Sequence, residues 1–514
     1  MKKIFYNFQH NFINSKFLTL FLYFIVFAFS ITLYLQTTNY NISGIDDDSF
    51  INFMFDDYSV KDIFTKNVLL SDTSKTYYRP LLSFSFFIDN YINQSPSTMH
   101  TTNVLLHSFC CVILMFFLKR YYFSKYVSFL AALLFSAHPV NIFAVAWIPG
   151  RNELLLCIFL LLSLIFLFEY LKKKKTILLF FHLIFFITTL FTKESSIFFP
   201  LFYVLYWLIY DKQISKKFFT VLGIYIVAVL CFLTIYKTLS YNIFNPTRYL
   251  FNLIYNIKTV FDYYFSVYFF KIHFSAYFGT KILILGLISF SLSFLFSFFC
   301  NLDKNEKILC FILPIIIFAI SLMAGQLFFQ GSRIYIPLIF LIIPFCSFIL
   351  KFLKEKIVYI ILSVFIIISL NVTVSNCHFF QNELAFFEAI DTEYPNYNIF
   401  MSNLYSYNLL KYGYFEEASK KTTLIAQKTG YKNIFNLYVL SVVYMHEKNY
   451  SEAINILEKI VNFDKNSVYS KLIVCYNMLG NKEKSLYYYN MLLNINKGDI
   501  NKTNEFIQRE KNVL

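Results

Sequence analysis

The chain has 514 residues, of which 58% are hydrophobic and only 15% are charged. A soluble domain of this length needs more polar surface, so the composition excludes an ordinary water-soluble enzyme and indicates that most of the chain lies in a membrane. The formal net charge of +15 does not indicate nucleic-acid binding, because many basic residues cluster in short segments between apolar stretches, as in cytoplasmic loops. The nine cysteines show neither a metal-ligand spacing nor a disulfide framework.

A membrane-spanning helix needs about 20 mainly apolar residues, and this criterion predicts eleven spans. They are residues 17–36, 101–118, 123–140, 154–171, 176–192, 196–210, 218–237, 281–300, 308–327, 333–350 and 357–375. Charged residues interrupt the aromatic stretch 247–272, so we expect it to form an interfacial helix on the membrane surface.

The basic residues predict one orientation in the membrane. If the N-terminus is cytoplasmic, every predicted inner segment is rich in lysine or arginine, whereas the short outer turns carry only Arg151, Lys193 and Arg333. The basic inner segments are 1–16, 119–125, 172–175, 211–217, 301–307 and 351–356. With eleven spans, the C-terminal part is then extracytoplasmic.

The polar C-terminal part shows an internal repeat. The small residues Ala418, Ala453 and Ser485 follow similar segments and are 35 and 32 positions apart, close to the period of about 34 residues of a tetratricopeptide repeat. We therefore predict an all-α chain with four parts. These are a polytopic membrane domain over 1–376, a connector over 377–399, a tetratricopeptide-repeat α-solenoid over 400–497 and a tail over 498–514.

The first outer loop, residues 37–100, contains three consecutive carboxylates, Asp46, Asp47 and Asp48. Adjacent carboxylates repel one another, so one can have a raised pKa and serve as a general base. They could instead bind a divalent cation. The third reading is structural, because acidic residues favour the start of a helix, here residues 49–55.

Four basic residues on the predicted outer face, Arg79, Arg151, Lys193 and Arg333, are candidates for binding a phosphate. Each one alone is more often an interfacial anchor. The other polar or aromatic residues expected to line this site are Tyr78, His100, Asn103, His107, His138, Trp147, Glu194 and Tyr335.

Several motifs on the same face resemble one family. They are YRPL at 78–81, HTTNVLLH at 100–107, AHPVNIFAVAWIPGR at 137–151 and TKE at 192–194. These motifs and the domain order resemble the transmembrane and tetratricopeptide-repeat O-mannosyltransferases and their bacterial relatives, in the GT-C glycosyltransferase superfamily. The resemblance covers residues 20–350 and the repeats. The chain departs from the family at 141–143, which lacks the family's carboxylate, and at 332–337, which lacks a glutamate.

The resemblance implies a membrane enzyme that moves one mannose-like sugar from a polyprenyl phosphate to a protein hydroxyl outside the cytoplasm, with inversion. The family's acidic pair maps to Asp46 and Asp47, with Asp48 as a further acid or metal ligand. No cofactor is implied, although a divalent cation could bind. The expected partners are membrane lipid, the donor, a protein or glycan acceptor, and proteins bound by the repeats. The implied location is a bacterial inner membrane. The alternatives are glycosylation of a lipid or cell-envelope glycan, and a non-catalytic scaffold.

Overall fold

The computed structural model describes residues 16–43, 59–66, 77–210, 216–239, 280–302, 331–393 and 399–513. Within these ranges the chain is helical and has no β-strand, so the predicted all-α class is confirmed for this part of the chain. The chain divides into two compact units, Met1–Asn382 and Glu383–Leu514.

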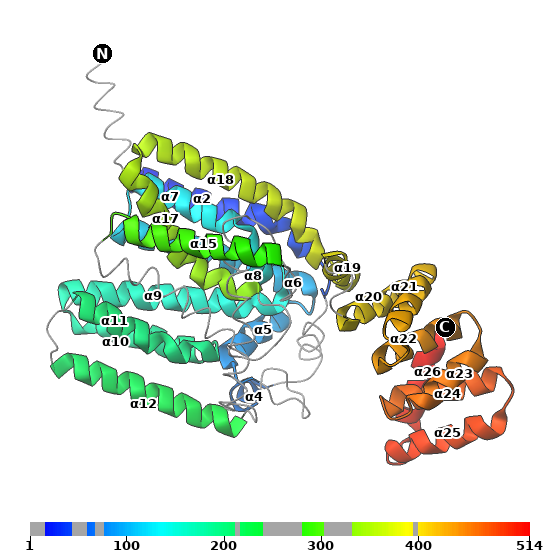
Figure 1. Ribbon diagram of the computed structural model, residues 1–514. Helices are drawn as coiled ribbons and strands as arrows, with labels where there is room; N and C mark the ends of the chain where they lie inside the picture. Colours follow the sequence, from blue (N-terminus) through cyan, green and yellow to red (C-terminus); the bar gives the residue numbers. More distant parts are fainter. Residues whose placement is uncertain are drawn as a thin grey trace. The chain divides into compact units, whose positions relative to one another are not determined.

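The N-terminal unit is a bundle of apolar helices that lie roughly along one common direction (Figure 1). The helices of this bundle are α2 (Lys16–Tyr34), α6 (Pro96–Tyr121), α7 (Lys125–Ala137), α9 (Arg151–Lys173), α10 (Thr176–Leu190), α11 (Phe199–Tyr210), α12 (Lys216–Leu239), α15 (Thr280–Phe299), α17 (Tyr335–Phe352) and α18 (Glu355–Asn376). Every predicted span that falls on described residues coincides with one of these helices. The predicted span 308–327 and the interfacial stretch 247–272 lie outside the described residues.

Several of these helices can cross a membrane, which identifies an integral membrane protein. In the described part, six helices are long and apolar enough, or seven if Lys125–Ala137 and Pro139–Val145, bent by 51°, form one broken span. The bend follows from Pro139, which cannot continue a helix and restricts the residue before it. Helices α10 and α11 are apolar but shorter than a typical span. The count of eleven spans therefore stays a prediction.

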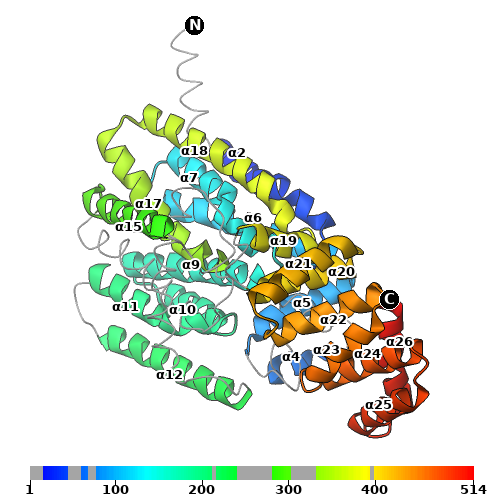
Figure 2. The ribbon, with the colours of Figure 1, turned by 45° about the vertical axis from the view of Figure 1, so that its right-hand side comes forward.

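Helix α6 lies at the centre of this unit, where it contacts α2, α7 and α9. Helix α18 packs on α7 at one edge of the bundle, and α12 lies at the opposite edge (Figures 1 and 2). This arrangement brings the starts of α6 and α9 side by side.

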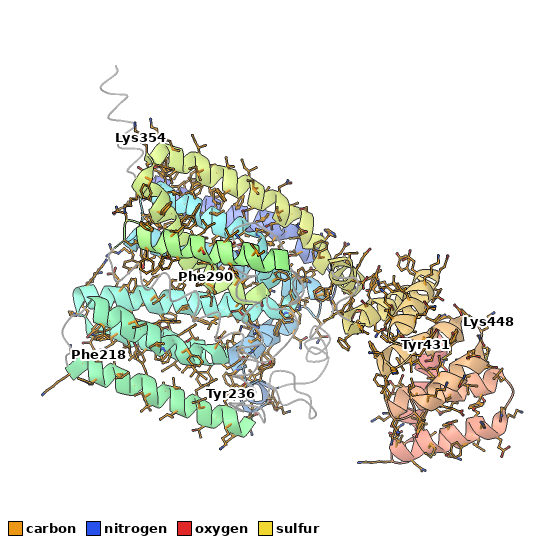
Figure 3. The ribbon with its side chains drawn as sticks, viewed as in Figure 1. Phe218, Tyr236, Phe290, Lys354, Tyr431 and Lys448 are labelled. Carbon is orange, nitrogen blue, oxygen red and sulfur yellow. The ribbon has the colours of Figure 1, made fainter. Side chains whose placement is uncertain are left out.

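The lysine-rich segments and the motif-bearing segments lie at opposite ends of the helices. Lys354, within the predicted inner segment 351–356, and Phe218, directly after the predicted inner segment 211–217, lie at one end, and Tyr236 lies at the other (Figure 3). Short elements connect the helices at the second end. They are η1 (Leu35–Asn39), α4 (Val60–Thr65), α5 (Pro80–Ile92), η2 (Pro139–Asn141), α8 (Ile142–Val145), η3 (Ile148–Gly150), η4 (Glu194–Phe198), η5 (Gly331–Ile334) and η6 (Cys377–Phe380).

The C-terminal unit is a series of packed helices. They are α19 (Glu383–Glu393), α20 (Ile399–Lys411), α21 (Phe415–Lys428), α22 (Ile434–His446), α23 (Tyr450–Lys459), α24 (Lys465–Met478), α25 (Lys482–Ile495) and α26 (Ile500–Val513). Helix α19 belongs to this unit, although its residues fall in the predicted connector. Helix α26 occupies the predicted tail and packs on α24, burying Thr503 and Ile507.

The turns and small residues of this unit recur at the spacing seen in the sequence. Ala418 and Ala453 are fully buried at the helix contacts, and Ser485 is buried at the equivalent position. Five residues before each lies a residue with positive φ, namely Gly413, Lys448 and Gly480. Figure 3 labels Lys448, which lies in the turn between α22 and α23. A positive φ ends each first helix and lets the chain reverse into the second helix of the pair.

A polar network joins four helices inside the N-terminal unit. His182 of α10 makes hydrogen bonds with the Ser163 hydroxyl of α9 at 2.9 Å and with the Tyr225 hydroxyl of α12 at 2.5 Å. The ring of Tyr203 of α11 lies edge-on to His182, with 4.7 Å between centroids. Hydrogen bonds between apolar helices contribute modestly but hold specific faces together.

We expect Tyr225→Phe to lower the free energy of unfolding by about 0.5–2 kcal/mol, because it leaves the His182 Nε2 atom without this partner. Thermal unfolding of the purified chain in detergent measures the effect. The matched control is Thr234→Val on the same helix, because the exposed Thr234 hydroxyl donates to the Leu230 carbonyl of its own helix, at 2.8 Å. Equal melting temperatures for the two variants would show that the network does not hold α12 on α10.

Candidate functional site

Arg79 and Glu194 form a bidentate ion pair between two short elements. Arg79 caps the start of α5, directly before Pro80, and Glu194 begins η4. The Arg79 Nε atom donates to Glu194 Oε2 at 2.8 Å, and Nη2 donates to Oε1 at 2.5 Å. The Arg79 guanidinium also lies 4.3 Å from the centre of the Tyr77 ring. Burial by itself raises the pKa of the Glu194 carboxyl, but the adjacent Arg79 reverses this and holds that pKa well below its usual range.

Lys193, the residue next to Glu194, forms a second buried pair. Its ammonium contacts the carboxylate of Glu153, in the first turn of α9. Burial lowers the pKa of the Lys193 ammonium, Glu153 opposes that shift, and the positive charges of Arg79 and Arg333 add to it. Arg333, from η5, is thus near enough to act electrostatically on Lys193.

These residues make one cluster of charges, which we call the outer charge cluster after the outer face predicted from the sequence. It consists of Arg79, Glu153, Lys193, Glu194 and Arg333. Three of these five described residues are basic and two are acidic. Guanidinium groups match the geometry of phosphate oxygens, and the Arg79 guanidinium has donors besides the two that face Glu194.

Arg151 has a different environment from the other predicted phosphate ligands. It is fully buried and forms an ion pair with Asp89 of α5, with 2.5 Å between Nη2 and Oδ2. Its Nη2 donates to the Met99 carbonyl at 2.8 Å, and its guanidinium lies 4.0 Å from the centre of the Phe86 ring. The guanidinium is already surrounded by partners from the protein, so Arg151 holds α9 against α5 and α6.

Asn103 completes this connection. Its side-chain carbonyl accepts a hydrogen bond from Arg151 Nε at 2.8 Å. Its amide nitrogen lies 3.2–3.3 Å from the carbonyl oxygens of Val145, Trp147 and Ile148. A single side chain of α6 therefore holds the turn before α9 in place.

The two histidines of the 100–107 motif lie about two turns apart on α6 and contact different parts of the chain. The His100 Nε2 atom is 3.3 Å from the Asn41 carbonyl oxygen, which ties α6 to the start of the first outer loop. The His107 Nδ1 atom makes a 2.7 Å hydrogen bond with the hydroxyl of Tyr335, the first residue of α17. Both histidines and Tyr335 are fully buried, so His107 and Tyr335 form part of the contact between α6 and α17.

The remaining predicted lining residues lie near the same end of the bundle. The Tyr78 hydroxyl donates to the Phe64 carbonyl of α4 at 3.0 Å. Helix α7 ends directly before His138, whose Nδ1 atom accepts a hydrogen bond from the Val140 amide at 3.3 Å. Trp147 is half-buried just before η3. Tyr78 thus ties the α5 start to the first outer loop, whereas His138 and Trp147 shape the bent segment before α9.

The predicted catalytic residues Asp46 and Asp47, and Asp48 with them, lie outside the described residues. In the described ranges, no group of three or more His, Cys, Asp or Glu side chains could hold a metal ion. The described part of the candidate site therefore consists of the basic residues and the residues that pack against them.

Sequence reasoning missed two carboxylates, Asp89 and Glu153, that pair with predicted basic residues. A signal for Asp89 was present, because it is the only charged residue of the apolar helix α5. A buried carboxylate is costly unless a cation pairs with it, so a lone one predicts a buried basic partner.

No family model matches the chain, but curated proteins match part of it. It is 37% identical over 97 residues to protein O-mannosyl-transferase TMTC1 of Mus musculus, covering 18% of this chain and 10% of the relative. It is 36% identical over 110 residues to protein O-mannosyl-transferase TMTC4 of Homo sapiens, covering 18% and 15%. It is 36% identical over 103 residues to protein O-mannosyl-transferase TMTC2 of Mus musculus, covering 20% and 12%. The match spans less than a sixth of each of these relatives, and over that part it confirms the resemblance.

We expect Arg151→Met to destabilise the fold by about 3–5 kcal/mol, because it leaves the Asp89 carboxylate buried without its cation. The double variant Arg151→Met/Asp89→Asn is expected to recover part of this loss. Yield and thermal unfolding in detergent are the measurements.

The control for this prediction is Arg120→Met. Arg120 pairs with Glu169 at the lysine-rich end, and its side chain is 46% exposed, so its loss is expected to cost less than about 1 kcal/mol. An Arg151→Met protein as stable as Arg120→Met would refute the supporting role of Arg151.

Proposed function

We propose that this chain, which resembles the protein O-mannosyl-transferases, is a membrane glycosyltransferase that moves one mannose-like sugar from a polyprenyl-phosphate carrier to a protein hydroxyl. The matched relatives carry the transferase name, and the apolar helices supply a setting in which a lipid-linked donor can approach from the bilayer. In our proposal the transfer takes place on the extracytoplasmic face, at the end opposite the lysine-rich segments.

The single observation that carries the proposal is the outer charge cluster. Arg79 and Lys193 lie side by side with Glu194 and Glu153 at the helix ends, and Arg333 acts electrostatically on Lys193. When the bond between sugar and phosphate breaks, the leaving phosphate gains one negative charge. Fixed cations in a water-poor site stabilise that charge more strongly in the transition state than in the bound donor.

In the proposed reaction, Asp46 or Asp47 accepts the proton of the acceptor hydroxyl. The acceptor oxygen attacks the anomeric carbon from the face opposite the phosphate, so the configuration inverts. The bond between the anomeric carbon and the phosphate oxygen breaks, and polyprenyl phosphate leaves with the electron pair. Arg79, Lys193 and Arg333 bind the phosphate, and Asp48 is a further acid or a ligand for a divalent cation.

Arg151 is not among the phosphate ligands in this proposal, because its guanidinium is buried against Asp89, Asn103 and Met99. We assign it, with Asn103, to fixing the start of α9. The first turn of α9 also carries Glu153, the partner of Lys193, so this support reaches the outer charge cluster directly.

We further propose a GT-C-type body with eleven spans, a cytoplasmic N-terminus and extracytoplasmic repeats, in a bacterial inner membrane. The recurrence of Gly413, Lys448 and Gly480 before the buried residues Ala418, Ala453 and Ser485 supports assigning the C-terminal unit as a tetratricopeptide-repeat solenoid. Such a solenoid would bind the acceptor protein or an assembly partner.

Two alternatives remain. The acceptor could be a lipid or a cell-envelope glycan, because the described residues carry no feature specific to a polypeptide. The chain could also be a non-catalytic scaffold, which is favoured by the buried apolar ring of Phe143 at the place where the resembled family has a carboxylate. Transfer of sugar by the purified chain separates both enzyme readings from the scaffold.

We expect Asp46→Asn and Asp47→Asn to show which carboxylate is the base, because the correct variant loses the proton acceptor and about 100-fold or more of the transfer rate. The assay is transfer of radiolabelled mannose from undecaprenyl-phosphate mannose or dolichyl-phosphate mannose to protein acceptors in proteoliposomes.

The matched control is Asp62→Asn, which alters a partly exposed carboxylate of the same loop that accepts a hydrogen bond from the Ser59 amide in the capping box of α4. It should leave the transfer rate unchanged. Full activity in both single variants and in the Asp46→Asn/Asp47→Asn double variant would remove the proposed base. No transfer by the unaltered chain from either donor to any acceptor would favour the scaffold.

A further inference from the structure

Gly331 lies directly against the ring of Phe143. A Cβ atom added at Gly331 would lie 2.2 Å from Phe143 Cδ2 and 2.5 Å from Cγ, distances that no real side chain adopts. Gly331 begins η5 and Phe143 lies in α8, so the contact joins two short elements at the motif-bearing end of the bundle. Any residue other than glycine at 331 must therefore displace either the ring or η5.

The ring of Phe143 has little room to move. It is 2% exposed and meets the ring of Phe380 edge-on, with 5.6 Å between centroids. The backbone behind it is also fixed, because a Cβ atom at Gly150 would lie 2.6 Å from the Phe143 carbonyl oxygen and 2.7 Å from that of Ala144. Phe380 of η6 therefore restrains the Phe143 ring, and Gly150 of η3 restrains the Phe143 backbone. The element that must shift is η5.

Element η5 carries Arg333, two residues after Gly331. A shift of η5 therefore moves the backbone that positions this guanidinium. We propose that Phe143 and Gly331 are positioning residues that set the place of Arg333 in the outer charge cluster, and thereby the affinity for the donor phosphate. This inference rests on the proposed function, because it assumes that the cluster binds a phosphate.

The size of the overlap indicates a measurable effect. A Cβ atom at 331 must move away from the ring by about 1–1.5 Å to reach ordinary van der Waals separation. Groups that bind or stabilise a reacting centre need to be placed within about 0.5 Å, and a misplacement of about 1 Å can cost as much as 100-fold. A single methyl group at 331 is therefore expected to weaken donor binding.

The test is the variant Gly331→Ala, with undecaprenyl-phosphate mannose as the probe in detergent or nanodiscs. We expect the Kd, and the KM for this donor, to rise about 10-fold or more. The double variant Gly331→Ala/Phe143→Leu, in which the smaller side chain makes room for the methyl group, should recover most of the affinity. The matched control is Gly223→Ala in α12, where an added Cβ meets nothing within 4 Å.

A second comparison separates positioning from general loss of stability. If Phe143 acts through Arg333, Phe143→Leu weakens binding of the probe in the unaltered chain but adds nothing in an Arg333→Met background. This comparison keeps Gly331 unchanged, so it also serves if Gly331→Ala alone does not fold. Equal weakening by Phe143→Leu in both backgrounds would overturn the inference.

The outcomes distinguish this inference from the proposed function. Probe binding by the unaltered chain, with unchanged affinity in Gly331→Ala, refutes the positioning role and leaves the proposed function standing. Failure of the unaltered chain to bind the probe refutes both. Weak binding by Gly331→Ala that Phe143→Leu restores supports both, because it shows that the ring contact acts on the donor site.

Discussion

Two ion pairs made by consecutive residues hold together the end of the helical bundle that carries the motifs. Glu194 pairs with Arg79 at the start of α5, and Lys193 pairs with Glu153 at the start of α9. Charges this deeply buried are costly unless they are paired, so the turn between α10 and α11 must stay close to both helices. The position of this turn therefore determines where Arg79 and Lys193 lie, and Arg333 of η5 acts electrostatically on Lys193.

Polar groups elsewhere in the N-terminal unit connect helices to one another. Asp89, Arg151 and Asn103 link α5, α6 and the start of α9, while His107 and Tyr335 link α6 to α17. These contacts leave the outer charge cluster on a rigid support, which binding sites require when the geometry of charges matters. Arg151 and Asn103 thus support the start of α9, whose first turn carries Glu153 of the outer charge cluster.

The sequence predicted much of this organisation, because hydropathy directly determines which stretches become helices. Each predicted span within the described residues coincides with a helix over most of its length, and Arg79, Lys193 and Glu194 are neighbours in the structure. The partners of buried charges were harder to predict, since Asp89 and Arg151 are distant in sequence and meet only through helix packing. The contact between Phe143 and Gly331 has the same origin. In the C-terminal unit, the spacing of the buried residues Ala418 and Ala453 was evident from the sequence. Helix α26 was not predicted, because residues 498–514 are mostly polar.

The most direct test of the central claim is a density map of the chain bound to a non-hydrolysable polyprenyl-phosphate mannose analogue. We predict that the phosphate lies beside Arg79, Lys193 and Arg333, with the anomeric carbon within reach of Asp46 or Asp47. A phosphate bound at the lysine-rich end of the helices, or carboxylates of the first outer loop that point away from the sugar, would contradict it.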